Sequence, residues 1–223
     1  MLREGLPFLE RTSSGPVIDI GCAVGRTSFE LAETLDEVVL GIDLNFGMLK
    51  TAATILEKGC ISYPRRRGGI AFERREFPAV FEKAEKVDFW VSDATALPFA
   101  DGTFSAGVSL NVLDCVWSPY DYLKEIGRIL MPGGNAVLST PYDWTANATP
   151  VEAWLGGHSQ RSAHQGSSPD ILRSLLSGGG HPNKIEALEL VSEKDLPWTL
   201  RLHNRSVMEY LVHLTVIGKK NDG

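Results

Sequence analysis

The sequence predicts an α/β fold built on a mostly parallel sheet, and its patterning and composition lead to this prediction. Short apolar runs alternate along the chain with segments whose apolar residues recur at helical spacing, as in βα units. The 223 residues suffice for a single domain, 1–223, and 43% hydrophobic with 22% charged residues is typical of a globular protein. A mainly disordered chain is thereby excluded.

The first βα unit has the clearest pattern. Residues 16–21 are an apolar run that ends in Gly21, and residues 26–35 carry apolar side chains at helical spacing. This pattern predicts a strand, a tight turn and a helix. Further strands are predicted at residues 38–42, 87–91, 104–110, 135–140, 185–191 and 206–217, and further helices at residues 48–56, 120–130 and 169–176.

Two segments do not fit this alternation. Residues 60–86 carry seven Lys or Arg against four Glu, in a chain whose net charge is −6, and they are longer than an ordinary connection. We interpret them as an inserted segment in which Arg65, Arg66 and Arg67 form either a solvated face or part of a carboxylate clamp. Residues 142–180, rich in Gly, Ser, Thr, Pro and Trp, are expected to form a substrate loop or lid with one helix.

Charge and cysteine content limit the partners. With 22 Lys and Arg against 28 Asp and Glu, the chain is not expected to hold nucleic acid by bulk electrostatics. No apolar run approaches the ~18 residues of a membrane span, and the N-terminus lacks the apolar core of a signal peptide, so we expect a cytoplasmic protein without membrane contact. Cys22, Cys60 and Cys115 are widely spaced without a C-x-x-C pair, so neither a disulfide framework nor a metal site is predicted.

The loop after the first strand has the features of a cofactor site. Between Val17 and Gly25, Asp19 precedes Gly21 by two positions, and the glycines are spaced G-x-x-x-G with Cys22 between them. Glycines at such a turn allow a ligand to approach the backbone closely. A dinucleotide fingerprint would require G-x-G-x-x-G, so a nicotinamide-dependent dehydrogenase is the less favoured competing hypothesis.

Acidic residues end the next two predicted strands. Asp43 ends the second strand, and Asp93 with Ala94 ends the third. The sequence Arg-Ile-Leu-Met-Pro-Gly-Gly at residues 128–134 precedes the fifth strand. An Asp after a strand is more often a helix N-cap than a ligand, so the order of these motifs carries more information than any one of them.

Together these motifs resemble those of class I S-adenosylmethionine (SAM) methyltransferases, whose first motif is D-x-G-x-G-x-G, with Ala23 in place of the usual middle glycine. The resemblance implies a Rossmann-like, seven-stranded, mostly parallel sheet with an antiparallel C-terminal strand. It implies SAM as cofactor, S-adenosylhomocysteine as product, Asp43 at the ribose and Asp93 at the adenine amino group. The residues that it places around the cofactor are Asp19, Gly21, Cys22, Gly25, Asp43, Asp93, Ala94 and Asn111.

A narrower resemblance covers residues 16–217. Several stretches look like the C-terminal methyltransferase domain of ovothiol synthases, with T-P-Y-x-W and W-L-G-G the most informative. These stretches are residues 19–32, 109–114, 140–144, 149–150, 154–157 and 195–198. In that family the domain N-methylates the imidazole of 5-thiohistidine. The resemblance therefore implies this amino acid as substrate and a separate sulfoxide synthase that supplies it.

The resemblance to class I methyltransferases also implies that the acceptor enters over the carboxyl ends of the fourth and fifth strands. Candidates for taking a proton from its nitrogen are Asp114, Tyr142, Asp143 and His203, which the sequence does not rank. Flat side chains can sandwich an imidazole, and arginine can grip both oxygens of a carboxylate. The residues expected to bind the substrate are Tyr142, Trp144, Trp154, Arg201 and Arg205.

Other interpretations of these residues stay open. Trp144 and Trp154 are alternatively core aromatics that hold a long loop. Strand alternation would put Arg201, His203 and Arg205 on one face, which is alternatively only an exposed polar face. The acceptor is alternatively another small molecule, such as a phenol, a carboxylate or a quinone precursor. From a different class, the chain is alternatively a SAM-binding regulatory module without turnover.

Overall fold

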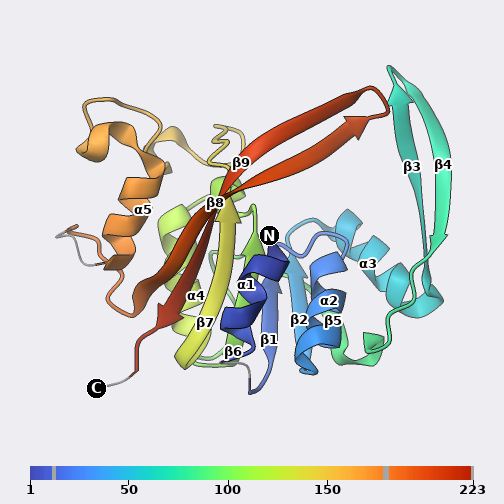
Figure 1. Cartoon of the computed structure of the whole chain (residues 1–223), viewed down its shortest axis with the longest axis horizontal. Coiled ribbons are helices and arrows are strands. Elements are labelled where there is room, and N and C mark those ends of the chain that lie inside the picture. The colour runs from blue at the N-terminus through green and yellow to red at the C-terminus, as the bar shows by residue number, and fades with distance from the viewer. Residues whose placement is uncertain (12–13, 178–180, 222–223) are drawn as a thin grey trace.

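The computed structural model describes residues 1–11, 14–177 and 181–221. Within these residues seven strands form one sheet in the order β5-β2-β1-β6-β7-β9-β8 (Figure 1). The strands are β1 (Val17–Ile20), β2 (Val39–Asp43), β5 (Val87–Val91), β6 (Phe104–Leu110), β7 (Leu130–Thr140), β8 (Leu188–His203) and β9 (Ser206–Lys219). The first five in this order pair in parallel, and β9 runs antiparallel to β7 and β8. The predicted α/β sheet with an antiparallel C-terminal strand is confirmed.

Helices cover both faces of the sheet. The helices α1 (Leu2–Leu9), α2 (Arg26–Leu35) and α3 (Phe46–Lys58) contribute to one apolar cluster, and α4 (Pro119–Ile129) and α5 (Ser168–Ser177) contribute to another. Alternate residues of a strand point to opposite faces, so Val137 belongs to the first cluster and Leu138 to the second. Within the described ranges, no helix is long and apolar enough to cross a membrane.

Several element boundaries depend on tertiary pairing. The strand β7 begins at Leu130 rather than at residue 135, because Leu130 pairs with Phe104 of β6. The strand β8 continues to His203 rather than residue 191, because β9 pairs with it to its end. Pro197 is tolerated there since β8 is an edge strand. The sequence does not predict α1, whose Gly5 and Pro7 weaken the helical pattern.

The inserted segment forms a separate hairpin. Its strands β3 (Cys60–Gly68) and β4 (Ala71–Pro78) make a two-stranded sheet beside the main one (Figure 1). The β8–β9 hairpin extends beyond the end of β7 at Thr140, which pairs with His213, and we call its outer part, residues 196–212, the arm. The arm reaches the tip of the β3–β4 hairpin, where Arg65 Nε donates to Asn204 Oδ1 at 3.0 Å (Figure 1).

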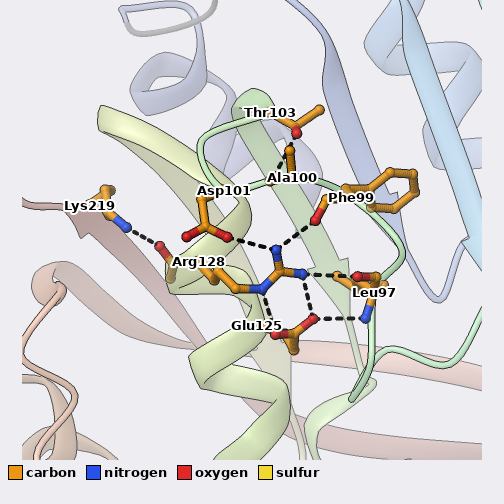
Figure 2. Close-up of polar contacts among 9 residues, drawn as sticks. Leu97, Phe99, Ala100, Asp101, Thr103, Glu125, Arg128 and Lys219 are labelled. Atoms are coloured by element: carbon orange, nitrogen blue, oxygen red, sulfur yellow. Dashed lines mark hydrogen bonds and ion pairs between the residues drawn. The ribbon is translucent and has the colours of Figure 1, made fainter.

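Arg128 of α4 anchors the loop between β5 and β6. Its guanidinium donates to the carbonyl oxygens of Leu97 at 2.9 Å and Phe99 at 2.6 Å (Figure 2). It also donates to the carboxylates of Glu125 at 2.8 Å and Asp101 at 2.9 Å, and it lowers the pKa of Glu125. Glu125 in turn accepts from the N–H of Leu97 at 2.7 Å. The loop that follows β5 is thereby tied to α4.

Candidate active site

A cavity of about 840 Å³ opens at the carboxyl ends of β1, β2, β5 and β6. The strand order reverses between β1 and β6, and ligands bind at such a reversal in open α/β sheets. The predicted cofactor residues that line the cavity are Gly21, Asp43, Asp93, Ala94 and Asn111. The motifs do not include the apolar lining residues Leu44, Met48 and Trp117. Their exposure in the structure marks them as residues that can contact a ligand, since Leu44 and Trp117 are each 71% exposed.

The loop after β1 is shaped for close contact. Gly21 has a φ of 74°, and a Cβ there would lie 2.3 Å from the side chain of Val112. Ala23 has a φ of 51°, which is costly for a residue with a Cβ. The N–H groups of Gly21 and Cys22 donate to the carbonyl of Ile42 at 2.8 and 2.9 Å. The loop is therefore fixed against the end of β2.

Asp43 joins the loops after β1 and β2. Its Oδ2 accepts from the N–H of Ala23 at 2.9 Å, and its Oδ1 accepts from the N–H of Asn45 at 2.7 Å. Each carboxylate oxygen has a further lone pair, and Asp43 lines the cavity. This side chain therefore shapes the cofactor loop and can also accept hydrogen bonds from a ligand's hydroxyl groups.

Asp19, Cys22 and Gly25 are absent from the described lining of the cavity. Asp19 is 2% exposed and accepts from the Ser28 hydroxyl at 2.6 Å. Burial raises the pKa of Asp19 to about 7, although the Ser28 hydrogen bond opposes the shift. A Cβ at Gly25 would lie 2.4 Å from the Phe89 ring. The contacts of Asp19 and Gly25 support the cofactor loop from within the protein.

Asp93 and Asn111 lie at the ends of β5 and β6. Asp93 is exposed, and its Oδ1 accepts from the N–H of Thr95 at 2.8 Å and from its hydroxyl at 2.7 Å. Asn111 has a φ of 59°, and its Oδ1 accepts from the Ser139 hydroxyl at 2.9 Å. Tyr142, after β7, has a φ of 55°. Such strained backbone in non-glycine residues is concentrated at functional sites in proteins.

Asp143 meets the arm at the edge where β7 ends. Its backbone N–H donates to Oδ2 of Asp114 at 2.7 Å, and Asp114 is 2% exposed, so burial raises the pKa of Asp114. Asp143 is exposed, and its Oδ2 accepts from the Tyr210 hydroxyl at 3.2 Å. The Tyr210 ring stacks on Trp198 with centroids 5.3 Å apart. The arm thus brings two aromatic residues from outside the predicted site residues to this edge.

Tyr142 belongs to a chain of polar contacts. Its hydroxyl is 2.7 Å from Nδ1 of His213, which is 4% exposed. The Nε2 of His213 is 2.9 Å from Oε2 of Glu193, whose Oε1 accepts from Nε of Arg173 at 2.8 Å. Burial raises the pKa of Tyr142. This chain fastens the loop after β7 to β9, β8 and α5.

Trp144 and Trp154 stack on each other with ring centroids 6.1 Å apart. Trp144 Nε1 donates to the Ser168 hydroxyl at 3.1 Å, and Trp154 Nε1 donates to the Thr149 carbonyl at 2.8 Å. Both rings are half-buried, and neither is among the described lining residues of the cavity. Their contacts are those of packing residues, and a role in substrate binding stays a prediction.

The predicted substrate loop or lid, residues 142–180, folds around these tryptophans. It contains short 3-10 helices at Val151–Ala153 and Ala163–Gly166, followed by α5. A Cβ at Gly156 would lie 2.5 Å from the carbonyl oxygen of Gly166, so the W-L-G-G stretch needs its first glycine for close packing. Residues 178–180 of this range lie outside the described residues.

The predicted strand face of Arg201, His203 and Arg205 does not form. The strand β8 ends at His203, and Arg205 lies in the following turn, so the three residues do not alternate along one strand. The Nδ1 of His203 accepts from the N–H of Arg205 at 3.2 Å, and both arginines are exposed. His203 therefore lies at the tip of the arm, whereas the other three proton-accepting candidates lie where β6 and β7 end.

The cavity fits the groups of SAM. Asp43 offers carboxylate oxygens for ribose hydroxyls, and Asp93 offers them for the adenine amino group. The apolar side chains of Leu44 and Met48 can cover a flat base. The lining continues to Cys115, which is next to the buried carboxylate of Asp114. The cavity thus extends from the cofactor loop to the neighbour of Asp114, while Asp114, Tyr142 and Asp143 are not among its described lining residues.

Comparisons with known proteins agree with this chemistry. A family model described as a methyltransferase domain matches residues 18–138. Phosphoethanolamine N-methyltransferase 1 of Triticum aestivum is 26% identical over 137 residues, which are 61% of this chain and 23% of that protein. The malonyl-[acyl-carrier protein] O-methyltransferase of Marinomonas is 25% identical over 175 residues, 77% of this chain and 54% of that protein. The chain thus spans about half or less of these relatives.

Solved structures share the fold. A SAM-dependent methyltransferase from Methanosarcina mazei superposes with a TM-score of 0.60 at 20% identity, covering 97% of this chain and 98% of that chain. The MccD protein superposes with a TM-score of 0.60 at 15% identity, covering 98% and 96%. At such identities the likeness concerns the fold alone.

Proposed function

The chain belongs to the methyltransferase domain family, and we propose that it transfers a methyl group from SAM to an imidazole nitrogen of 5-thiohistidine or a near relative. It is a SAM-dependent methyltransferase with a Rossmann-like fold, and the acceptor is the proposed part. When bound, SAM supplies a methyl group on a positively charged sulfur. The protein contributes mainly alignment of the acceptor nitrogen with that methyl group.

The main support for this proposal is that segments far apart in the sequence lie together at one edge of the sheet. The stretches that resemble the ovothiol-type domain on the acceptor side are residues 140–144, 149–150, 154–157 and 195–198. Tyr142 is hydrogen-bonded to His213, and Asp195 pairs with His213 across β8 and β9. Trp144 stacks on Trp154. Residues that the resemblance links only by sequence are thus neighbours in space, which supports a common acceptor site.

The chemistry of a thiolated imidazole defines what the site must do. A thiol beside an imidazole favours a thiolate–imidazolium form, in which a proton covers the nitrogen lone pair and the sulfur is a rival nucleophile. The site must hold the sulfur away from the methyl group and take up a proton. The stacked rings of Trp198 and Tyr210 beside the exposed carboxylate of Asp143 offer a surface suited to a flat cation. In this proposal a separate sulfoxide synthase supplies the substrate.

A methylation assay tests the acceptor. The protein is incubated with SAM and a panel of imidazoles, phenols and carboxylic acids, and the products are identified by mass spectrometry. We expect 5-thiohistidine to gain one methyl group on a ring nitrogen and none on sulfur. Methylation of a phenol or carboxylic acid, with 5-thiohistidine unchanged, would show the substrate proposal to be wrong and leave the methyltransferase activity in place.

The arginines of the arm are the proposed partners of the substrate carboxylate. Arg201 and Arg205 are exposed beside His203 at the tip of the arm, and their charge, rather than their distance from the other acceptor residues, is the ground for this assignment. Neutralising the arginine that binds, by Arg201→Gln or Arg205→Gln, should raise KM for 5-thiohistidine by about tenfold or more, the value of a charge-assisted contact. KM for the decarboxylated analogue should not change. If both variants change KM for 5-thiohistidine and for its decarboxylated analogue to the same extent, the proposed carboxylate contact is excluded.

A further inference from the structure

The candidate proton acceptors occupy different surroundings. The carboxylate of Asp114 is buried and already accepts the backbone N–H of Asp143. The hydroxyl of Tyr142 is bonded to the buried ring of His213. His203 lies at the tip of the arm and accepts from its neighbour's N–H. Asp114 is thus closed off by burial, Tyr142 is engaged with a buried ring, and His203 lies away from the ends of β6 and β7.

Asp143 differs from them. It is exposed, and its Oδ1 accepts no hydrogen bond from the described residues, while Oδ2 is held by the Tyr210 hydroxyl. Its backbone is held by Asp114, whose neighbour Cys115 lines the cofactor cavity. Asp143 is thus a carboxylate with one oxygen held by Tyr210 and the other free of hydrogen bonds from the described residues, and Asp114 alone separates it from Cys115 in the cavity lining.

Tyr210 fixes that carboxylate from the arm. The residue pairs with Trp198 across β8 and β9, and the two rings stack, so the position of the phenol is set by the hairpin itself. Burial and the neighbouring Asp143 carboxylate raise the pKa of Tyr210, so its hydroxyl stays the donor. A hydroxyl that donates to Oδ2 restricts rotation of the carboxylate and directs Oδ1.

We propose that Asp143 is the catalytic residue that receives the acceptor's proton and that Tyr210 is the positioning residue that aims it. The N–H bond at the acceptor nitrogen breaks, its proton passes to Oδ1 of Asp143, and its electron pair becomes the lone pair of that nitrogen. This lone pair forms the new N–C bond while the methyl–sulfur bond breaks, and the electron pair of the broken bond stays on sulfur. The carboxylic acid later returns the proton to water. The arm is therefore part of the active site.

A double-mutant cycle tests this pairing. It uses wild type, Asp143→Asn, Tyr210→Phe and the double variant, with kcat, KM for the acceptor and the Kd for SAM measured for each. Asp143→Asn should lower kcat about 100-fold or more, the usual contribution of a positioned base. Tyr210→Phe should lower kcat about three- to tenfold, as expected for one hydrogen bond. Both should leave the SAM Kd within about twofold, because neither lines the cofactor cavity, and any rise in the acceptor KM should be smaller than the fall in kcat.

The double variant shows whether Tyr210 acts through Asp143 or independently of it. If Tyr210 acts through Asp143, adding Tyr210→Phe to Asp143→Asn causes no further loss, because coupled residues are not additive. A merely structural tyrosine would multiply the two losses, and that result overturns the pairing. A rise in KM with kcat unchanged in Asp143→Asn overturns the role as proton acceptor. Partial recovery in Asp143→Glu supports it.

Controls separate folding and substrate choice from the inference. Tyr120→Phe, on α4, removes a hydroxyl outside the site and should leave kcat unchanged. Melting temperatures verify that each variant folds. The inference rests on the proposed function only in requiring an acceptor that loses a proton, so the cycle is run with whichever protic acceptor turns over in the panel. A phenol as acceptor with a non-additive cycle refutes the thiohistidine proposal alone. An additive cycle with 5-thiohistidine refutes this inference alone.

Discussion

The cofactor half, residues 16–138, and the acceptor half, the described residues of 139–219, are held together in different ways. In the cofactor half, the acidic residues that line the cavity bind backbone groups of nearby loops: Asp43 accepts from Ala23 N–H, 20 positions away, and Asp93 from Thr95 N–H, 2 positions away. In the acceptor half, the contacts that join the loop after β7 to β9 are between side chains over long separations: Tyr142 reaches His213 across 71 positions.

This difference has a consequence for specificity. A backbone N–H is present whatever the side chain, so most residues of the cofactor loops can vary without loss of the contact. A contact between two side chains requires both residues. The family model ends at residue 138, where the acceptor half begins. We therefore expect shared cofactor chemistry in the first half and substrate choice in the second.

The largest expected effect concerns Asp19, a buried side chain of the cofactor half that is bonded to another side chain, as in the acceptor half. The pKa of Asp19 is about 7 in the folded protein against an ordinary 3.8. The folded state therefore keeps a proton that the unfolded state releases, so stability is highest below about pH 4 and falls as pH rises to about 7. Asp19→Asn should remove up to about 4 kcal/mol of this fall between pH 4 and pH 8. Denaturant unfolding at several pH values measures it.

An exposed aspartate provides the control for this prediction. Asp88→Asn makes the same chemical change at the surface and should leave the pH dependence of wild type. Parallel curves for wild type and Asp19→Asn would mean that Asp19 is ionised in the folded protein throughout this range.

The next prediction compares one tryptophan from each half, by its effect on the free energy of unfolding and on the Kd for SAM. Trp154→Ala removes half of the Trp144–Trp154 stack and should cost about 2 to 3 kcal/mol of unfolding free energy, less than a fully buried tryptophan, while the Kd for SAM stays unchanged. Trp117→Ala should weaken SAM binding and leave the unfolding free energy nearly unchanged, because Trp117 is 71% exposed and lines the cavity. Thermal melts and calorimetry with SAM measure both. Weaker SAM binding in Trp154→Ala would show that the halves are coupled.

Asp43 tests the cofactor half directly. Asp43→Ala removes a charged acceptor from the cavity wall and should weaken SAM binding by about ten- to a hundredfold, or about 1.5 to 3 kcal/mol. Asp43→Asn keeps the shape and one acceptor oxygen and should lose less. Calorimetry on folded variants decides the matter, and an unchanged Kd for Asp43→Ala would remove this residue from the site.

The smallest effect concerns the contact between the two hairpins. Arg65→Ala removes the exposed hydrogen bond to Asn204 and should change the unfolding free energy by less than about 1 kcal/mol. Asn204→Ala should have the same or a smaller effect, because Arg65 also pairs with Glu73 at 3.9 Å, and the double variant should be no worse than Arg65→Ala alone. A loss of several kcal/mol would mean that the arm depends on the inserted hairpin for its fold.

Local patterns explain why much of the cofactor half is predictable. The helix at residues 26–35 begins and ends where its apolar spacing indicates, and Gly21, Asp43, Asp93, Ala94 and Asn111 line one cavity. Each lies at the end of a strand that the sequence marks as an apolar run. Parallel strands bring their carboxyl ends to one edge, so the order of elements alone places these residues together.

The sequence by itself thus determines the α/β order and the edge at which a ligand binds, because periodicity and turn residues act over a few positions. Only the tertiary structure decides the partners in the acceptor half. The sequence offers several histidines and tyrosines there, but the register of β9 against β7 and β8 puts His213, rather than His203, beside Tyr142. The same register brings Tyr210 to Asp143, 67 positions away. A shift of one residue in that pairing would turn each of these side chains to the face opposite its present one, and no local pattern in the chain encodes the register.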